Sequence, residues 1–194
     1  MKNKFKIIAT VFTGIIVGLT CTAQAQDRPT REETLAEIKK DFGFVPNLLN
    51  EMSKSPAAPL VYTKTEGIMH KGYLTPMEQQ VVQLTVSLFN GCHYCSSMHS
   101  KFSEVNSLSH EDVVAIRTHK NPKNKRAGDL VWVTNTILEK RGHLSDKDLE
   151  IIENMDIDRA RLYEILAQIG RKMIANYAVH IIKPELDDVF KFEE

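Results

Sequence analysis

Apolar side chains recur along most of the chain at intervals of three and four residues, the spacing of one face of an α-helix. No stretch alternates apolar and polar positions convincingly, and no Asn-Gly or Asp-Gly turn separates two strand-like runs. The pattern predicts an all-α fold, in which a capped arm over residues 30–54 precedes the main helices. These helices are expected near residues 56–71, 76–90, 92–104, 110–118, 122–141, 146–154 and 158–182.

Capping residues mark the expected helix starts. Ser55, Thr75 and Asn121 each precede a proline, which the first position of a helix accommodates well. Ser109 and Ser145 are each followed three residues later by an aspartate, the spacing of a reciprocal cap. These five positions therefore divide the chain into separate helices.

The first 25 residues have the pattern of a secretory signal peptide rather than of a folded element. Three lysines lie within the first six residues, an apolar run covers residues 7–19, and the small-x-small site Ala23-Gln24-Ala25 follows. The run is too short for a membrane-spanning helix, so an uncleaved anchor is the weaker alternative. We expect cleavage before Gln26 and a location in the bacterial periplasm or outside the cell, where disulfides persist.

Composition narrows the class of protein. The chain has 194 residues, of which 42% are hydrophobic and 26% charged, and this is typical of a globular protein. The net charge is zero and there is no long basic run, which argues against nucleic-acid binding. No stretch is apolar enough for a stable membrane span. We expect a signal peptide (1–25), an N-terminal arm (26–54) and one helical domain (55–194).

Without the signal peptide, which contains Cys21, two cysteines remain in the chain, Cys92 and Cys95. Residues 90–91, Asn-Gly, break the preceding helix, so Cys92 is expected to open the next one. Cys92, Cys95 and His99 are then three and four residues apart and share one helix face. The free amides and dipole of a helix N-terminus stabilise a thiolate, and an imidazole can accept a thiol proton.

Other uses of this Cys-x-x-Cys motif compete with a redox-active dithiol. A structural disulfide is common in exported proteins, although a loop this short restricts the unfolded chain little. A zinc site would need a fourth ligand that no second motif supplies, and attachment of c-type haem would need histidine where Ser96 stands. A thioredoxin-like motif would follow a strand rather than a helix. The redox dithiol is the leading interpretation from the chemistry alone.

Two segments of the sequence resemble a known protein family. Residues 74–80, Leu-Thr-Pro-Met-Glu-Gln-Gln, and residues 90–99, Asn-Gly-Cys-His-Tyr-Cys-Ser-Ser-Met-His, resemble the AhpD-like alkylhydroperoxidase branch of the carboxymuconolactone decarboxylase family. Residues 176–181 and 184–187 resemble the C-terminal part of one subgroup, so the resemblance covers roughly residues 40–192. It implies an all-α, AhpD-like helical bundle that assembles as a homo-oligomer, a trimer or a hexamer.

The resemblance also implies roles for the motif. Cys95 would attack a hydroperoxide and become a sulfenic acid, and Cys92 would resolve it to a disulfide. His99 would belong to the proton relay that activates Cys95. An external thiol would reduce the disulfide, and no metal or other cofactor is implied. The decarboxylase branch lacks the paired cysteines, so their presence argues against lactone decarboxylation.

One position departs from the family pattern. The relay glutamate of the family lies twelve residues before the first cysteine, where this chain has Gln80. Glutamine forms hydrogen bonds but does not exchange a proton at neutral pH. Glu78 is a poor substitute, because it lies on another side of the helix and fits a capping box with Thr75. The relay is thus expected to consist of His99 and water, and peroxidase efficiency is in question.

Two further residues are candidates for the site. Tyr177 and His180 are three residues apart on the last long helix, among apolar neighbours. They are expected to form a hydrogen-bonded pair in the core, or, if His180 faces the cysteines, to supply the missing base. Trp132 is expected in the core as well. Met69, Met98 and Met173 are interpreted as packing residues.

These observations together predict an exported dithiol peroxidase that acts through Cys95 and Cys92 and that a separate thiol system must keep reduced. A thiol–disulfide exchange protein acting on other proteins remains an alternative, as does a non-catalytic helical protein with a structural disulfide. The first two functions need a reactive cysteine that a substrate can reach. The third needs only a buried, inert bridge.

Overall fold

The structure, a computed structural model, describes residues 28–193, so the expected signal peptide lies outside the described part. Within residues 28–193 the structure is helical and contains no strand, which confirms the all-α prediction. The helices are α1 (Arg31–Phe42), α2 (Asn47–Met52), α3 (Ala58–Met69), α4 (Pro76–Phe89), α5 (His93–Val105), α6 (His110–Arg117), α7 (Lys125–Lys140), α8 (Asp146–Asn154), α9 (Arg159–Ile182) and the 3₁₀ turn η1 (Asp188–Phe190).

Three of the five expected helix starts are confirmed. Thr75 caps α4 and Ser145 caps α8, each in a reciprocal capping box with the acid three residues later. Ser109 caps α6 by accepting a hydrogen bond from the amide of Asp112. Each cap satisfies amide groups that have no partner inside the helix.

Two helix starts were predicted too early. Helix α3 begins at Ala58 rather than at Pro56, because a start at Ser55 would place Pro59 where the helix needs its first amide donor. The Ser55 hydroxyl instead accepts a hydrogen bond from the Ala58 amide, at 3.2 Å.

The start of α7 is likewise later than Pro122. The Asp112 carboxylate accepts hydrogen bonds from the amides of Lys123 (2.6 Å) and Asn124 (3.1 Å) and holds this segment as a loop. Asn124, and not Asn121, therefore caps the helix.

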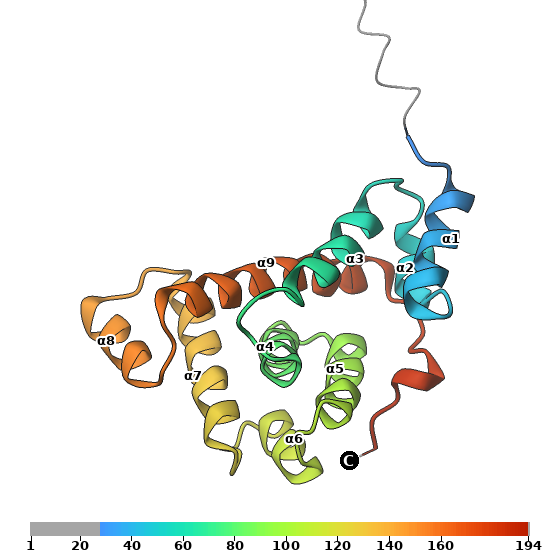
Figure 1. The fold of residues 1–194 in the computed structure, drawn as a ribbon. Helices are drawn as coiled ribbons and strands as arrows, with labels where there is room; N and C mark the ends of the chain where they lie inside the picture. The colour runs from blue at the N-terminus through green and yellow to red at the C-terminus, as the bar shows by residue number, and fades with distance from the viewer. Residues whose placement is uncertain (1–27, 194) are drawn as a thin grey trace, which may run out of the picture.

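Helix α4 is the centre of the fold. It is viewed end-on in Figure 1 and packs against α5, α7 and α9, with α6 beside α5. Its side chains are buried over most of its length, because neighbours cover it on several sides. The largest apolar cluster of the protein forms around it, with contributions from Leu84, Leu130, Val133, Ile152 and Ile165.

A second apolar cluster surrounds the two cysteines. The N-terminal arm contributes Ile38, Leu48 and Leu49, and the segment after α9 contributes Phe190. Cys92 and Cys95 lie within this cluster. Both ends of the described chain thus pack around the cysteine motif, on the right side of Figure 1.

Trp132 was predicted to be a core residue, and this was wrong. Its side chain is 37% exposed. Helix α7 turns Leu130 and Val133 toward the core, and Trp132 projects from another side of the helix. Met69 is buried, which confirms its interpretation as a packing residue, whereas Met98 is buried but also lines the cavity described below.

None of the helices in the described part combines the length and the apolar character that crossing a membrane requires.

Candidate active site around Cys92 and Cys95

The turn between α4 and α5 places the first cysteine at a helix N-terminus. Gly91 adopts a positive φ of 66°, which glycine accommodates without strain. The Cys92 amide donates to the Ser87 carbonyl at 2.9 Å and anchors the turn to α4. Cys92 is the N-cap of α5, where its Sγ accepts a hydrogen bond from the Cys95 amide at 3.3 Å.

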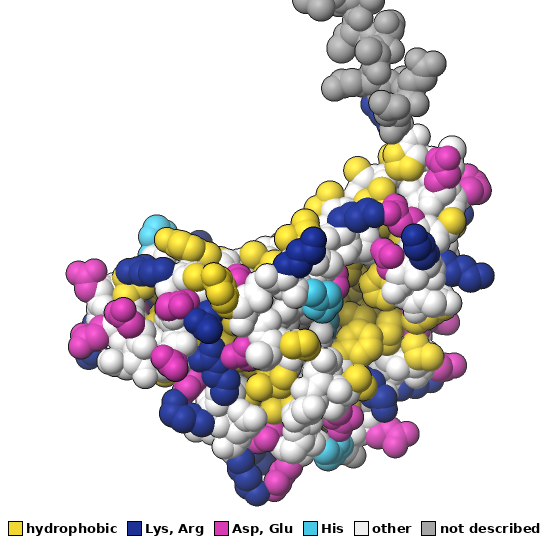
Figure 2. Space-filling model, viewed as in Figure 1, with side chains coloured by type: hydrophobic (Ala, Val, Ile, Leu, Met, Phe, Trp, Pro, Cys, Tyr) yellow, Lys and Arg dark blue, Asp and Glu magenta, His cyan; other side chains and the backbone are white. Residues whose placement is uncertain are grey.

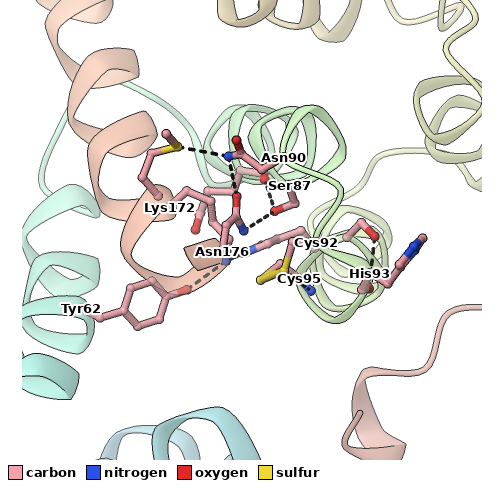
Figure 3. Close-up of a disulfide and its surroundings, with 12 residues drawn as sticks. Tyr62, Ser87, Asn90, Cys92, His93, Cys95, Lys172 and Asn176 are labelled. Carbon is pink, nitrogen blue, oxygen red and sulfur yellow. Dashed lines mark hydrogen bonds between the residues drawn. A yellow bond between two sulfur atoms is a disulfide. The ribbon is translucent and has the colours of Figure 1, made fainter. Parts of the chain in front are cut away.

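Cys92 and Cys95 are joined as a disulfide, with their Cα atoms 5.3 Å apart. Both are buried, at 1% and 0% exposure respectively. In Figure 3, Tyr62 and Lys172 lie on one side of the disulfide and the axis of α5 lies on the other. The sulfur atoms are therefore enclosed by α5 and by side chains from α3 and α9.

His99, one turn after Cys95, is the centre of a buried hydrogen-bonded chain. Its Nδ1 lies 2.8 Å from Gln80 Oε1, and its Nε2 lies 2.5 Å from Lys172 Nζ. Lys172 also donates to the Tyr62 hydroxyl at 3.1 Å. Because the Lys172 ammonium or amine donates to Nε2, the neutral imidazole carries its proton on Nδ1 and donates it to Gln80.

The structure brings two of the predicted site residues, Gln80 and His99, into contact. The contact is a hydrogen bond from the imidazole to an amide oxygen. Gln80 orients the ring and does not take up its proton. The ionisable partner of His99 is Lys172 instead.

Burial and nearby positive charge keep His99 neutral. Burial lowers the pKa of His99 first, and the charges of Lys172 and Arg171 lower it further, to well below its ordinary value. A neutral imidazole is able to accept a proton, but a second positive charge beside Lys172 is costly. His99 is therefore suited to orient Lys172 and to transfer a proton, but not to remain protonated.

Lys172 is completely buried, which is rare for lysine. Burial lowers its pKa, opposed by the attraction of Tyr62 and supported by the repulsion of Arg171. Burial alone raises the pKa of Tyr62, but the charges of Lys172 and Arg171 outweigh it and leave the pKa below its ordinary value. The Lys172–Tyr62 pair thus holds a proton that is released more easily than that of an exposed lysine.

Arg171 closes the other side of this cluster. It donates to the Tyr62 carbonyl at 3.2 Å and to Gln83 Oε1 at 2.6 Å, and it is paired with Glu66. Its guanidinium lies over the Tyr62 ring, 4.2 Å from the centroid. The charge of Arg171 is balanced by Glu66, so Lys172 is the buried cation that contacts the histidine.

Sequence reasoning missed Lys172, Arg171 and Tyr62. A usable signal was present, because Gln168, Lys172 and Asn176 are spaced four residues apart along α9 and share its inner face with Ile165 and Val179. Polar side chains on the buried side of a helix need partners there. A lysine at such a position is a candidate for a functional site.

Tyr177 and His180 do not belong to the site. Both are exposed on α9, and their rings stack on each other with centroids 6.4 Å apart. The predicted core pair was therefore wrong, and so was the alternative in which His180 supplies a base to the cysteines. Helix α9 is oriented about its axis so that Lys172 and Asn176 point inward, and Tyr177 and His180 therefore point to its outer side.

A second set of hydrogen bonds ties the cysteine turn to α9. The Asn90 amide donates to Asn176 Oδ1 at 2.9 Å, and Asn176 donates to the Ser87 hydroxyl at 3.4 Å (Figure 3). Asn90 and Ser87 flank the turn that leads into Cys92. The position of the disulfide relative to Lys172 is thereby set by contacts on both sides.

The segment after α9 fixes the other side of α5. The Tyr94 hydroxyl donates to Asp187 at 2.5 Å, and Asp187 also accepts from the Asn47 amide at the start of α2, at 3.2 Å. Burial and the Asp187 carboxylate raise the pKa of Tyr94 far above its ordinary value, so Tyr94 keeps its proton. The Ser97 hydroxyl donates to the Phe190 carbonyl at 2.8 Å.

A cavity of about 460 Å³ opens beside the relay residues. Figure 2 shows it as a hollow with a hydrophobic lining, below the N-terminal helices α1, α2 and α3. Gln80, His99, Tyr62 and Arg171 lie at its polar end, and the two cysteines are not part of its wall. The apolar wall comes from both the arm and α5, namely Phe42, Leu48, Leu49, Met98 and Phe102.

Within residues 28–193, no group of three or more His, Cys, Asp or Glu side chains is arranged to hold a metal ion. The described residues around the disulfide are instead a lysine, a tyrosine and amides, which are donor groups suited to proton transfer and hydrogen bonding.

Comparison with known proteins confirms the family resemblance. Residues 57–122, which include Gln80, both cysteines and His99, match the carboxymuconolactone decarboxylase family. No curated protein matches the chain significantly in sequence.

Solved structures show the same fold. A peroxidase-related protein from Ralstonia eutropha JMP134 with an alkylhydroperoxidase AhpD core is 16% identical, covers 82% of this chain and 86% of its own, and has a TM-score of 0.73. A peroxidase-related protein from Silicibacter sp. TM1040 is 15% identical, covers 89% and 97%, and has a TM-score of 0.70. The debrominase Bmp8 in complex with 2,3,4-tribromopyrrole is 17% identical, covers 86% and 90%, and has a TM-score of 0.65. The fold is therefore AhpD-like.

Proposed function

We propose that this chain, whose residues 57–122 match the carboxymuconolactone decarboxylase family, is an exported dithiol peroxidase. It reduces organic hydroperoxides with Cys95 as the attacking thiolate and Cys92 as the resolving thiol. The disulfide of the structure is the oxidised end of this cycle. An external dithiol, whose identity we leave open, returns it to the reduced state.

One observation carries the proposal. A buried cysteine pair at a helix N-terminus lies beside a continuous chain of hydrogen bonds, which runs from Gln80 through His99 and Lys172 to Tyr62. A structural disulfide needs no such chain, and burying a lysine beside it costs stability. Perturbed ionisable groups held together next to a cavity are typical of active sites.

The first step is the formation of the Cys95 thiolate. The thiol proton passes to Lys172 Nζ in its neutral form, which the lowered pKa makes accessible. Free amides at the start of α5 stabilise the thiolate. His99 holds Lys172 in place through Nε2, and Gln80 holds His99 through Nδ1. The base that the family places at position 80 is thereby replaced by one on α9.

The remaining steps balance without a further oxidant. The Cys95 thiolate attacks the terminal peroxide oxygen, the O–O bond breaks, and the alkoxide takes the proton from Lys172 to leave as an alcohol. Cys95 is then a sulfenic acid. The Cys92 sulfur attacks the Cys95 sulfur, and the Cys92 thiol proton leaves with the hydroxyl group as water. Two thiols are consumed for each hydroperoxide.

The cavity supports an apolar substrate for the same site. Its wall is mostly apolar and its polar end carries His99 and Tyr62, so an alkyl group fits the wall with the peroxide toward the relay. Both sulfurs are covered in the oxidised state, so the peroxide reaches Cys95 after the bridge opens. The similarity to a debrominase makes a brominated pyrrole the appropriate competing substrate in a first assay.

The burial of the disulfide is compatible with a purely structural bridge and argues against a protein that exchanges disulfides with other proteins. A bridge at 0–1% exposure is what a purely structural disulfide requires. The same burial favours reduction by a small dithiol over exchange with large folded proteins, because access to an enclosed sulfur falls as the attacking molecule becomes larger.

The test is stopped-flow oxidation of the reduced chain by an organic hydroperoxide, with thiols counted before and after. The proposal predicts fast loss of two thiols per chain. Cys95→Ser should abolish peroxide consumption, and Cys92→Ser should still consume one equivalent and accumulate a sulfenic acid. Oxidation of the parent no faster than that of free cysteine would exclude the peroxidase and leave the structural disulfide.

Gln80→Glu tests the relay within the same assay. A carboxylate at position 80 accepts the Nδ1 proton of His99, so we expect faster Cys95 oxidation in the variant, on the order of tenfold. Gln83→Glu is the matched control, because Gln83 lies one turn later on α4 and contacts Arg171 rather than His99. Equal effects of the two variants would show that added negative charge, and not the relay position, matters.

A further inference from the structure

Helix α9 carries an apolar face that the described chain leaves uncovered. Its exposed large side chains are Tyr163 (63%), Leu166 (40%), Ile174 (37%), Tyr177 (51%) and Ile181 (83%). Ala167 and Gly170 are exposed between them. We refer to these seven residues as the Gly170 stripe. Single exposed apolar residues are ordinary, but a continuous row along a helix of 24 residues is not.

The usual polarity of a surface helix is reversed in α9. The charged side chains in its middle, Arg171 and Lys172, are buried, together with Gln168 and Asn176. From Leu162 to Ile182, no exposed residue is a lysine, arginine, aspartate or glutamate. A helix face without charge is disfavoured in water and typical of one that another surface covers.

The stripe is symmetric about Gly170. Leu166 and Ile174 lie four residues before and after it, and Tyr163 and Tyr177 lie seven residues before and after it. At about 100° per residue, all four point within roughly 40° of the direction of Gly170. When α9 is turned end for end about Gly170, Leu166 and Ile174 exchange places, and so do Tyr163 and Tyr177. The pattern of side chains on this face is therefore nearly the same in both directions.

We infer that the Gly170 stripe binds a second copy of this chain, with the two α9 helices antiparallel across a two-fold axis at Gly170. In this arrangement Tyr163 faces Tyr177 of the partner and Leu166 faces Ile174 of the partner. Each pair occurs twice, as a two-fold interface requires. The absence of a side chain at Gly170 lets the helices approach closely at the axis.

The available area fits a small interface. Fully buried aromatic side chains cover about 150–250 Å² each, so the exposed parts of the stripe total on the order of 500 Å² per copy. The pair would bury about 1,000 Å², which is near the lower limit for a specific interface. We therefore expect a dimeric contact that depends on the stripe being complete.

Gly170→Glu tests the contact, with mass measured by light scattering of the full chain at tens of micromolar. A Cβ at Gly170 meets nothing within 4 Å, so the variant should fold like the parent in circular dichroism. We expect an even-numbered assembly for the parent and at least a tenfold weaker association for the variant. Gly67→Glu is the control, because Gly67 is a helical glycine with equally open space outside the stripe.

Cysteine cross-linking tests the direction of the helices. Gly170→Cys should cross-link to itself at the axis. Tyr163→Cys alone should not, because its two copies would lie about 21 Å apart. A mixture of Tyr163→Cys and Tyr177→Cys should give the mixed dimer. A monomer, a simple trimer, or self-linking of Tyr163→Cys would overturn the proposal, the first of these leaving the stripe to a different partner.

Discussion

Lys172 is the residue whose surroundings say most about the chemistry of this protein. It is fully buried, it contacts His99 and Tyr62, and Arg171 and Glu66 are the other charged groups near it. Gln80 stands where the family resemblance implies a relay glutamate, and it forms a hydrogen bond with His99. In the relay that we propose, the ionisable group therefore lies on α9 rather than on α4.

Lys172→Met should change both the pH dependence of stability and the rate of Cys95 oxidation. The pKa of Lys172 in the folded chain lies below its ordinary value of 10.5, so the unfolded chain binds more protons between the two values. The parent's free energy of unfolding should therefore rise with pH toward about 10.5, and the variant's should rise less. The change should slow Cys95 oxidation about 100-fold.

Urea unfolding at several pH values, together with stopped-flow oxidation, makes this measurement. Lys140→Met is the control, because Lys140 is a half-exposed lysine paired with Asp148 on the other side of the molecule. A variant of Lys172 whose pH slope and oxidation rate both match the parent would rule out the relay assigned to it.

At the scale of elements, capping chemistry decides where the helices begin. The boxes at Thr75 and Ser145 were visible in the sequence because they depend on residues three positions apart. The starts predicted at Pro56 and Pro122 were wrong. The first overlooked Pro59, which lacks the amide donor that the first turn needs, and the second was decided by Asp112 on another helix. A capping pattern gives the correct start only when every residue that affects the first turn is taken into account.

Thr75→Ala should lower the free energy of unfolding by about 1 kcal/mol, because it removes the side-chain acceptor for the Glu78 amide. The central position of α4 makes this loss visible in global unfolding by urea. Thr75→Ser retains the oxygen and should stay within about 0.5 kcal/mol of the parent. A serine variant as unstable as the alanine variant would show that the methyl group, and not the cap, is what matters.

At the scale of the whole molecule, both ends of the described chain are used to build the site. The N-terminal arm supplies Phe42, Leu48 and Leu49 to the cavity, and Asp187 joins the start of α2 to Tyr94 beside Cys95. The family match over residues 57–122 contains neither end. Part of the cavity wall therefore comes from residues outside the range that matches the family.

Asp187→Ala should destabilise the fold by roughly 1–3 kcal/mol, because the Tyr94 hydroxyl and the Asn47 amide lose their acceptor together. Asp188→Ala is a matched control in the next position, where the carboxylate is exposed and pairs only with Lys191 among the described residues. Chemical unfolding of the two variants makes the comparison. Equal, small effects would show that the C-terminal segment does not brace α5.

The main helices, three of their five predicted caps and the shared face of Cys92, Cys95 and His99 could be predicted from the sequence. Each of these depends on residues a few positions apart, within reach of helical geometry. The resemblance to the family was also contained in these local motifs.

Which side of each helix is covered depends on the packing of helices that are far apart in the sequence. This packing buries Lys172, 73 residues after His99, and leaves Tyr177 and His180 exposed on the same helix. The apolar residues of α9 lie on both sides of it, so hydrophobic periodicity did not indicate the inner face. Contacts with α3, α4 and α5 set that rotation, and with it which ionisable side chain of α9 contacts His99.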